Sequence, residues 1–185
     1  MMRRWSIATL AIALLIGNAG CLSRLLREGA GAVRGARGKV VPIQAPSELG
    51  GYRGLRVESI TVSSRLMAPD DLAKLVRDAF ARAVEKNTTL TPGGTPRLLL
   101  SGEVIHFERG GAVDTVIGPL EEVIVRTKLI DESAGSVLAE ANLVGRSKAS
   151  TSSGTENLSE GAGRALIKWL KSGGVKIEEE EDGND

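Results

Sequence analysis

The chain has 185 residues, of which 42% are hydrophobic and 25% charged, as is usual for a globular protein with a packed core. Its 24 Lys and Arg are balanced by 23 Asp and Glu, which argues against a nucleic-acid-binding protein, because such proteins carry a basic excess. The single cysteine excludes an internal disulfide, and the single histidine excludes a metal site built from several histidines.

Residues 1–20 have the three parts of a secretory signal peptide. Arg3 and Arg4 form a positively charged start, residues 7–16 form an apolar run, and small residues precede Cys21. The apolar run is too short to span a membrane, which takes about 20 apolar residues. We therefore expect residues 1–20 to be removed from the mature protein.

Cys21 directly follows Ala19 and Gly20, and this arrangement resembles the lipobox of bacterial lipoproteins. The resemblance implies that the Cys21 thiol receives a diacylglyceryl group and that the new amino terminus is acylated after cleavage. Asn18 departs from the aliphatic residue that is usual at its position. Leu22 stands where Asp often signals inner-membrane retention, so the resemblance favours the outer membrane, with the domain in the periplasm. The alternative is a secreted protein that is cleaved nearby and in which Cys21 is incidental.

Residues 21–51 are predicted to be a lipidated, flexible tether. Glycines alternate there with arginine and lysine, and no apolar period is sustained. The basic residues are either simply solvated or attracted to anionic lipid headgroups near the anchor.

The next segments predict a strand, a helix and a second strand. Apolar residues alternate imperfectly over Gly54–Ser63, which indicates a strand. After Pro69, apolar residues recur at steps of three and four through Glu85, which indicates an amphipathic helix that Asp70 or Asp71 begins. Alternation over Arg97–Phe107 predicts the second strand.

Two further strands and a closing helix follow. Leu120–Asp131 and Val137–Arg146 alternate clearly and are joined by a turn in which Gly135 suits a left-handed position. Thr155 or Asn157 is predicted to cap a final helix that buries Trp169 and ends at a glycine pair.

The order β-α-β-β-β-α predicts an α+β fold, a two-layer sandwich with a mostly antiparallel sheet and both helices on one face. The order of the strands within the sheet is not predicted. The domain is expected to cover residues 52–173, and residues 174–185 are expected to form an acidic, disordered tail.

The segment from Leu98 to Ser150 resembles bacterial lipoprotein domains of the DUF4410 type. The resemblance rests on a glycine-bearing strand, a Gly-rich turn, and a strand that ends in Asp131 before Gly135, Val137 and Leu138. It extends over roughly residues 52–172, and the layout is also similar to the amino-terminal domain of TolB and to curli-secretion lipoproteins. The sequence departs from the pattern after Gly118, where further glycines are usual. The resemblance implies no particular functional residues.

His106 is flanked by Glu103 and Glu108, a group that can be drawn as an acid–base pair. On a regular strand, however, Glu103 and His106 face opposite sides, so we interpret His106 as a packed or surface residue.

Three other segments have a structural and a functional interpretation. Gly110-Gly111 is either a phosphate-binding loop or a hairpin turn, and the turn is favoured because no helix follows. Ser150–Gly154 either holds an anion or caps the last helix. Glu178–Asp182 either binds cations weakly or is a solvated tail, since it lacks the geometry of a calcium loop. No metal or cofactor is therefore predicted.

Three functions stay open, in order of preference. The first is a non-catalytic, protein-binding accessory domain anchored through Cys21, with a membrane and an envelope protein as partners, no nucleic acid, and an unknown oligomeric state. The second is an envelope hydrolase, and the third is a carrier of a small ligand or lipid, which requires an apolar pocket between sheet and helices.

Overall fold

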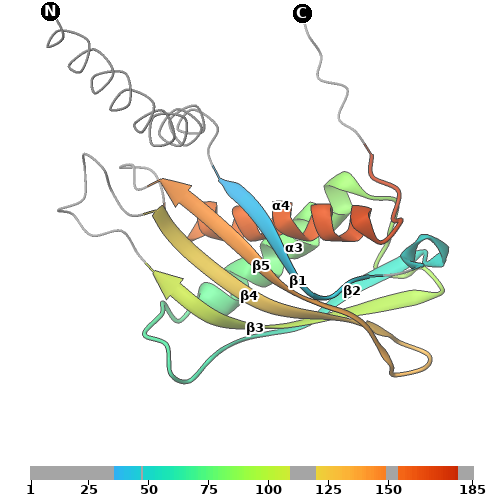
Figure 1. Ribbon diagram of the computed structural model, residues 1–185, viewed down its shortest axis with the longest axis horizontal. Coiled ribbons are helices and arrows are strands. Elements are labelled where there is room, and N and C mark those ends of the chain that lie inside the picture. The colour runs from blue at the N-terminus through green and yellow to red at the C-terminus, as the bar shows by residue number, and fades with distance from the viewer. Residues whose placement is uncertain (1–35, 47, 109–119, 149–153, 179–185) are drawn as a thin grey trace, which may run out of the picture. The chain divides into compact units, whose positions relative to one another are not determined.

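The computed structural model describes residues 36–46, 48–108, 120–148 and 154–178, whose elements are labelled in Figure 1. Its strands are β1 (Arg37–Gln44), β2 (Gly54–Val62), β3 (Arg97–Glu108), β4 (Leu120–Asp131) and β5 (Val137–Lys148). Its helices are the short 3-10 turn η2 (Leu49–Gly51) and the α-helices α3 (Leu72–Asn87) and α4 (Thr155–Ser172).

The five strands form one sheet in the order β1-β5-β4-β3-β2. β2 runs parallel to β3, and every other neighbouring pair is antiparallel. α3 and α4 cover the same face of this sheet (Figure 1). The predicted two-layer α+β sandwich is therefore confirmed, and the predicted β-α-β-β-β-α order gains one strand at its start.

The added strand, β1, lies inside the range assigned to the flexible tether, residues 21–51. It pairs with β5 along its length, and the folded unit begins at Ala36, so the tether prediction is wrong from that residue onward. The strand is hard to recognise in the sequence because the residues on its helix-facing side are Gly38, Val40 and Pro42, of which only the valine is strongly apolar.

Glycines allow α4 to lie very close to β1 and β5. A Cβ atom placed on Gly38 would overlap the backbone of α4, and one on Gly145 would lie 2.7 Å from the nitrogen of Ala162. From the side of the helix, a Cβ on Gly161 would lie 2.6 Å from the carbonyl oxygen of Arg37. Only residues without a Cβ fit at these distances, so the three glycines determine the depth at which α4 is seated.

Two bulges interrupt the first two predicted strands; the first explains the imperfect alternation over Gly54–Ser63, and the second breaks the regular alternation expected over Arg97–Phe107. The pairing of β2 with β3 shifts between Val57 and Ser59, and the pairing of β3 with β4 shifts between Val104 and His106. A bulge adds one residue to one strand, so the side chains after it change face relative to strict alternation.

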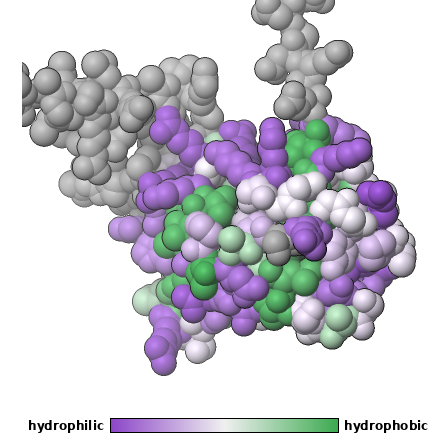
Figure 2. Space-filling model, turned by 45° about the vertical axis from the view of Figure 1, so that its right-hand side comes forward, coloured by the Kyte–Doolittle hydropathy of each residue, from purple (hydrophilic) through white to green (hydrophobic). Residues whose placement is uncertain are grey.

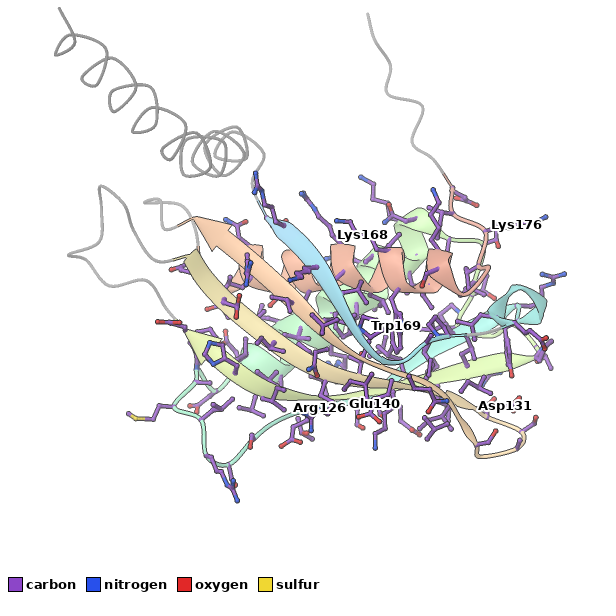
Figure 3. All side chains as sticks on the ribbon, viewed as in Figure 1. Arg126, Asp131, Glu140, Lys168, Trp169 and Lys176 are labelled. Carbon is purple, nitrogen blue, oxygen red and sulfur yellow. The ribbon has the colours of Figure 1, made fainter. Side chains whose placement is uncertain are left out.

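The core fills the space between the sheet and the two helices. Trp169 lies there, between α4 and the strands, as Figure 3 shows, and its predicted burial is confirmed. The other large side chains that are almost completely buried come from both layers and include Phe80, Leu72, Leu98, Leu100, Leu129, Leu143 and Leu166. Aliphatic residues dominate this core because the chain has few aromatic residues.

The chain stays folded beyond the predicted domain, residues 52–173, and into the predicted acidic tail, residues 174–185. Val175 is buried, and the Glu178 N–H donates a 2.9 Å hydrogen bond to the carbonyl oxygen of Asn87. This segment lies against the end of α3, so the domain extends at least to Glu178. The acidic residues after it lie outside the described residues.

The face of the sheet opposite the helices carries many polar side chains. Figure 3 shows Arg126 and Glu140 on this side, and a cross-strand ion pair joins Arg146 to Glu122. In Figure 2, which views the molecule from another direction, hydrophobic residues form separate patches divided by hydrophilic ones. The surface on view therefore has no single broad apolar face.

Candidate functional site

Several predicted sites lie outside the described residues. These are Cys21 with the preceding residues 1–20, the pair Gly110-Gly111, and most of the loop Ser150–Gly154. Lipid attachment and signal cleavage therefore stay predictions. Gly154 is the one residue of this loop that the structure describes, and it is the N-cap of α4, with no side-chain capping hydrogen bond. The prediction that Thr155 or Asn157 caps this helix is therefore wrong.

The structure corrects the prediction that Glu103 and His106 face opposite sides of their strand. Glu103 pairs with Arg126 and His106 with Ile124, two residues of β4 that share a face, because the bulge after Val104 shifts the register. The His106 Nε2 atom lies 3.7 Å from a carboxylate oxygen of Glu108, and both side chains are about half exposed to solvent. This exposed pair forms a weak surface contact.

Within the described ranges, no three His, Cys, Asp or Glu side chains come together in a way that would hold a metal ion. Neither described α-helix combines the length and apolar character that a membrane-crossing helix requires.

The β4–β5 hairpin is held by Asp131, the residue predicted to end its first strand. Its carboxylate accepts hydrogen bonds from the Ser133 N–H (2.7 Å) and hydroxyl (2.6 Å), the Ala134 N–H (2.9 Å) and the Tyr52 hydroxyl (2.6 Å). These donors, the Ser133 hydroxyl first, hold the pKa of Asp131 well below its usual range. Gly135 adopts a left-handed φ of 65°, as the turn prediction requires.

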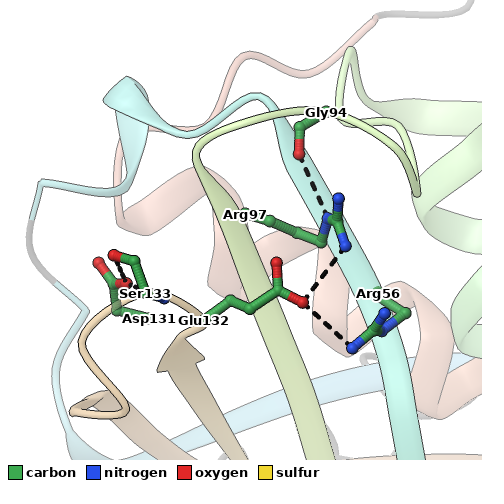
Figure 4. A network of polar contacts seen from close by, with 6 residues as sticks. All are labelled: Arg56, Gly94, Arg97, Asp131, Glu132 and Ser133. Carbon is green, nitrogen blue, oxygen red and sulfur yellow. Dashed lines mark hydrogen bonds and ion pairs between the residues drawn. The ribbon is translucent and has the colours of Figure 1, made fainter.

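The neighbouring residue, Glu132, ties the hairpin to two other strands (Figure 4). One of its carboxylate oxygens lies 3.2 Å from Arg97 Nη1 on β3 and 3.1 Å from Arg56 Nη2 on β2. Arg97 also donates to the carbonyl oxygen of Gly94 at 3.3 Å. These contacts join the hairpin to β2 and β3 at this end of the sheet.

Tyr52→Phe is expected to lower the free energy of unfolding by about 1 kcal/mol at neutral pH, because it removes one hydrogen bond. Burial, together with the bond to Asp131, raises the pKa of Tyr52 to about 12 from its usual 10.0. Tyr52 therefore stabilises the fold fully below pH 10, and this contribution is lost as the pH rises through about 12.

Urea unfolding of both proteins between neutral pH and pH 12 checks this expectation. The free energies of unfolding of the parent chain and of Tyr52→Phe should converge above pH 10. A difference at pH 12 as large as that at neutral pH would contradict the stabilising role of the Tyr52 hydroxyl. The hydrogen bonds that lower the pKa of Asp131 stabilise the fold while its carboxyl group is ionised. We expect this contribution to the free energy of unfolding to be present above pH 3.8 and to be lost as the pH falls below that value.

Two buried polar atoms of the described residues lack a hydrogen-bond partner, Glu121 Oε2 and Trp169 Nε1. Glu121 is only 5% exposed and lies opposite Ser147 on the helix-facing side of the sheet. Strict alternation places Glu121 on the same face as Val123, so its burial was predictable although the sequence interpretation passed over it.

A groove of about 700 Å³ lies between β2, which is an edge strand of the sheet, and α3. We call it the β2–α3 groove. Leu55 and Val57 line it from the strand, and Ala81, Val84 and Glu85 line it from the helix. The turn at residues 88–92 and Glu178 close one end. Arg56, Arg77 and Asp78 also line the groove, so its walls combine apolar and charged side chains.

A second groove, of about 520 Å³, lies at the opposite edge, between β1 and α4. Val40, Pro42 and Trp169 line it, with Lys39 and Lys168 beside them. Both grooves open at the edges of the sandwich, each between an edge strand and a helix, whereas the carrier hypothesis requires an apolar pocket enclosed between the two layers. The space between these two layers is filled by the buried side chains of the core.

Comparison with solved structures shows a shared fold with PelC of Paraburkholderia phytofirmans. Two PelC dodecamer structures, one of them a point variant, match with a TM-score of 0.52 each and identities of 20% and 18%. Each match covers 72% of this chain and 97% of PelC. A Caulobacter crescentus protein described as a lipoprotein matches with a TM-score of 0.39 and 18% identity, over 60% of this chain and 88% of that one.

At identities of 20% and below, the similarity shows a shared fold alone. The TM-score of the Caulobacter protein is too low to support any further conclusion. No family model and no curated protein sequence matches the chain. The resemblance to DUF4410-type domains is therefore not confirmed, whereas the fold is one that PelC shares.

Proposed function

We propose that the chain is a lipid-anchored protein of the bacterial outer membrane whose periplasmic domain binds other envelope proteins and catalyses no reaction. The observation that carries the proposal is the lipobox-like sequence ending in Cys21, the one cysteine of the chain. The folded domain begins at Ala36, so a short segment would connect it to the anchor. Such a connection keeps the domain near the bilayer while leaving its surfaces free to bind partners.

The chemistry of the described residues supports a binding role over the alternative of an envelope hydrolase. His106 stands on an exposed strand face beside Glu108, and the most strongly shifted pKa values belong to Asp131 and Tyr52, which hold a hairpin. General acid–base catalysis needs a base that can reach a substrate held in a concave site. A hydrolase would have to lose its activity when Glu103, His106 or Glu108 is replaced while the fold stays intact.

Photo-crosslinking in living cells tests the proposal. A photoreactive amino acid is placed in turn at exposed positions on different faces: Arg126 on the open sheet face, Ala81 on α3 and Lys168 on α4. We expect at least one position to give a discrete crosslinked product with an envelope protein, and the other faces to serve as controls. No product from any face would contradict a protein-binding role. The PelC structures are dodecamers, and products twice the mass of the chain would indicate self-assembly here as well.

A further inference from the structure

The β2–α3 groove combines an open strand edge with an apolar channel. On the outer side of β2, the Thr91 N–H donates to the carbonyl oxygen of Arg53 (3.1 Å), and the Leu55 N–H donates to that of Thr91 (3.2 Å). The residues before and after Thr91 turn away, so this parallel pairing is a single isolated bridge. Alternate residues of a strand direct their main-chain groups to the same edge, so Val57 presents its N–H and C=O there, next in line after Leu55.

The side chains beside this edge line the groove of about 700 Å³. Val84 is buried at its floor, Val57 is half-buried, and Ala81 is an exposed small residue on the facing helix surface. A strand placed along β2 alternates its side chains, so every second one would point between Val57 and Ala81. An aliphatic side chain suits that position because the surrounding atoms are apolar.

At the end of the groove beside residues 88–92, the charged lining residues are Glu85 and Glu178, for which no ion pair is found among the described residues. The two arginines of the lining are already engaged, Arg77 with Asp78 (3.4 Å) and Arg56 with Glu132 (3.1 Å). Glu85 also belongs to the last turn of α3, where the helix dipole is negative. The end of the channel beside Glu85 and Glu178 therefore favours a cationic side chain.

We propose that the β2–α3 groove binds an extended, basic and aliphatic segment of a partner protein, which adds to the sheet as a strand beside β2. The segment bonds to the main chain at Val57, places an aliphatic side chain against Ala81, and places a lysine or arginine near Glu85 and Glu178. Main-chain pairing supplies affinity, and the side-chain positions supply specificity. The inference rests on the proposed protein-binding role and specifies the surface that carries it.

The test uses the purified full chain and a fluorescent peptide with blocked ends, Thr-Val-Thr-Lys-Thr-Val, measured by anisotropy. Its valines and lysine stand at alternate positions and so share the face that meets the groove. We call it the lysine–valine peptide. We expect saturable binding that Ala81→Arg or Glu85→Lys weakens about tenfold or more. Both positions are exposed on α3, so the fold should be kept, which circular dichroism verifies. Glu160→Lys is the matched control, because it makes the same change of charge on an exposed position of α4 outside the groove, and it should leave the affinity unchanged.

Two further peptides separate strand addition from simple charge attraction. The same peptide with glutamate in place of lysine should not bind, and a lysine–valine peptide with N-methylated backbone nitrogens should lose binding because it cannot pair with β2. The proposal is overturned if the lysine–valine peptide does not bind, or if N-methylation and Ala81→Arg have no effect. It is also overturned if Ala81→Arg instead abolishes a dimer of the chain, which would assign the groove to a second copy. If the groove proposal fails in one of these ways but a photoreactive residue on another face crosslinks to an envelope protein, the proposed protein-binding function is still supported.

Discussion

Gly145→Ala is expected to destabilise the domain by about 3 kcal/mol, although it adds only one methyl group. The new Cβ would overlap the carbonyl oxygen of Leu158 and lie 2.7 Å from the nitrogen of Ala162. Both are backbone atoms of α4, so no change of side-chain rotamer relieves the overlap. The whole helix has to move away from β5, and the buried side chains that it carries lose contacts with the sheet.

Urea unfolding of the two proteins, followed by circular dichroism, measures this effect. Gly93→Ala is the matched control, because a Cβ there meets no atom within 4 Å. The control should be as stable as the parent chain or up to about 1 kcal/mol more stable, since alanine restricts the unfolded chain more than glycine does. Equal stability of the two variants would contradict the close seating of α4 on β5.

The parts of the fold that could be predicted are those in which one face of an element is buried and the other is in water. α3 and α4 are of this kind, and so are β4 and β5, whose helix-facing residues are buried in alternation. In such elements apolar residues recur with the period of the helix or strand, so their pattern is enough to predict the element. The hairpin between β4 and β5 was predictable for a second reason, because the φ of 65° at Gly135 favours a residue without a Cβ.

β1 could not be predicted because many of its contacts with α4 are made by backbone and only Val40 on its helix-facing side is strongly apolar. Gly38 touches the helix through its main chain, and Arg164 and Lys168 donate hydrogen bonds to the carbonyl oxygens of Ala36 and Gly38. Main-chain contacts of this kind leave no apolar period in the sequence. The many glycine and basic residues of this segment are also typical of a linker, so composition favoured the wrong interpretation.

The candidate sites were harder to predict than the elements for two reasons. The bulge after Val104 decides whether Glu103 and His106 share a face, and a one-residue shift in register has no marker in the sequence. The β2–α3 groove depends on β2 being an edge strand, which follows from the strand order and therefore from the whole chain. Its charged end also depends on Glu178, a residue that the sequence assigned to a solvated tail.

Cys21→Ser is expected to abolish the incorporation of an alkyne-tagged palmitate into the protein in living cells. The thiol is the group that the lipobox resemblance assigns to modification, and the chain has no second cysteine that could take the label. Without lipidation the segment ahead of residue 21 should also stay uncut, so the intact mass should include residues 1–20. Ser23→Ala, two residues further on, is the matched control and should keep both the label and the cleavage. Label in the Cys21→Ser protein, or none in the parent, would contradict the anchor.

The way in which the parent protein is held to membranes gives an independent check on the same anchor. Each buried methylene of an acyl chain contributes about 0.8 kcal/mol, so more than one chain gives binding that salt does not reverse. Attraction between the basic residues after Cys21 and anionic headgroups is different, because it is screened within roughly 3 Å at about 1 M salt. We therefore expect the parent protein to stay with the membrane pellet in about 1 M sodium chloride and to be released only by detergent. Release by salt alone would mean that charge, and not lipid, holds the domain at the bilayer.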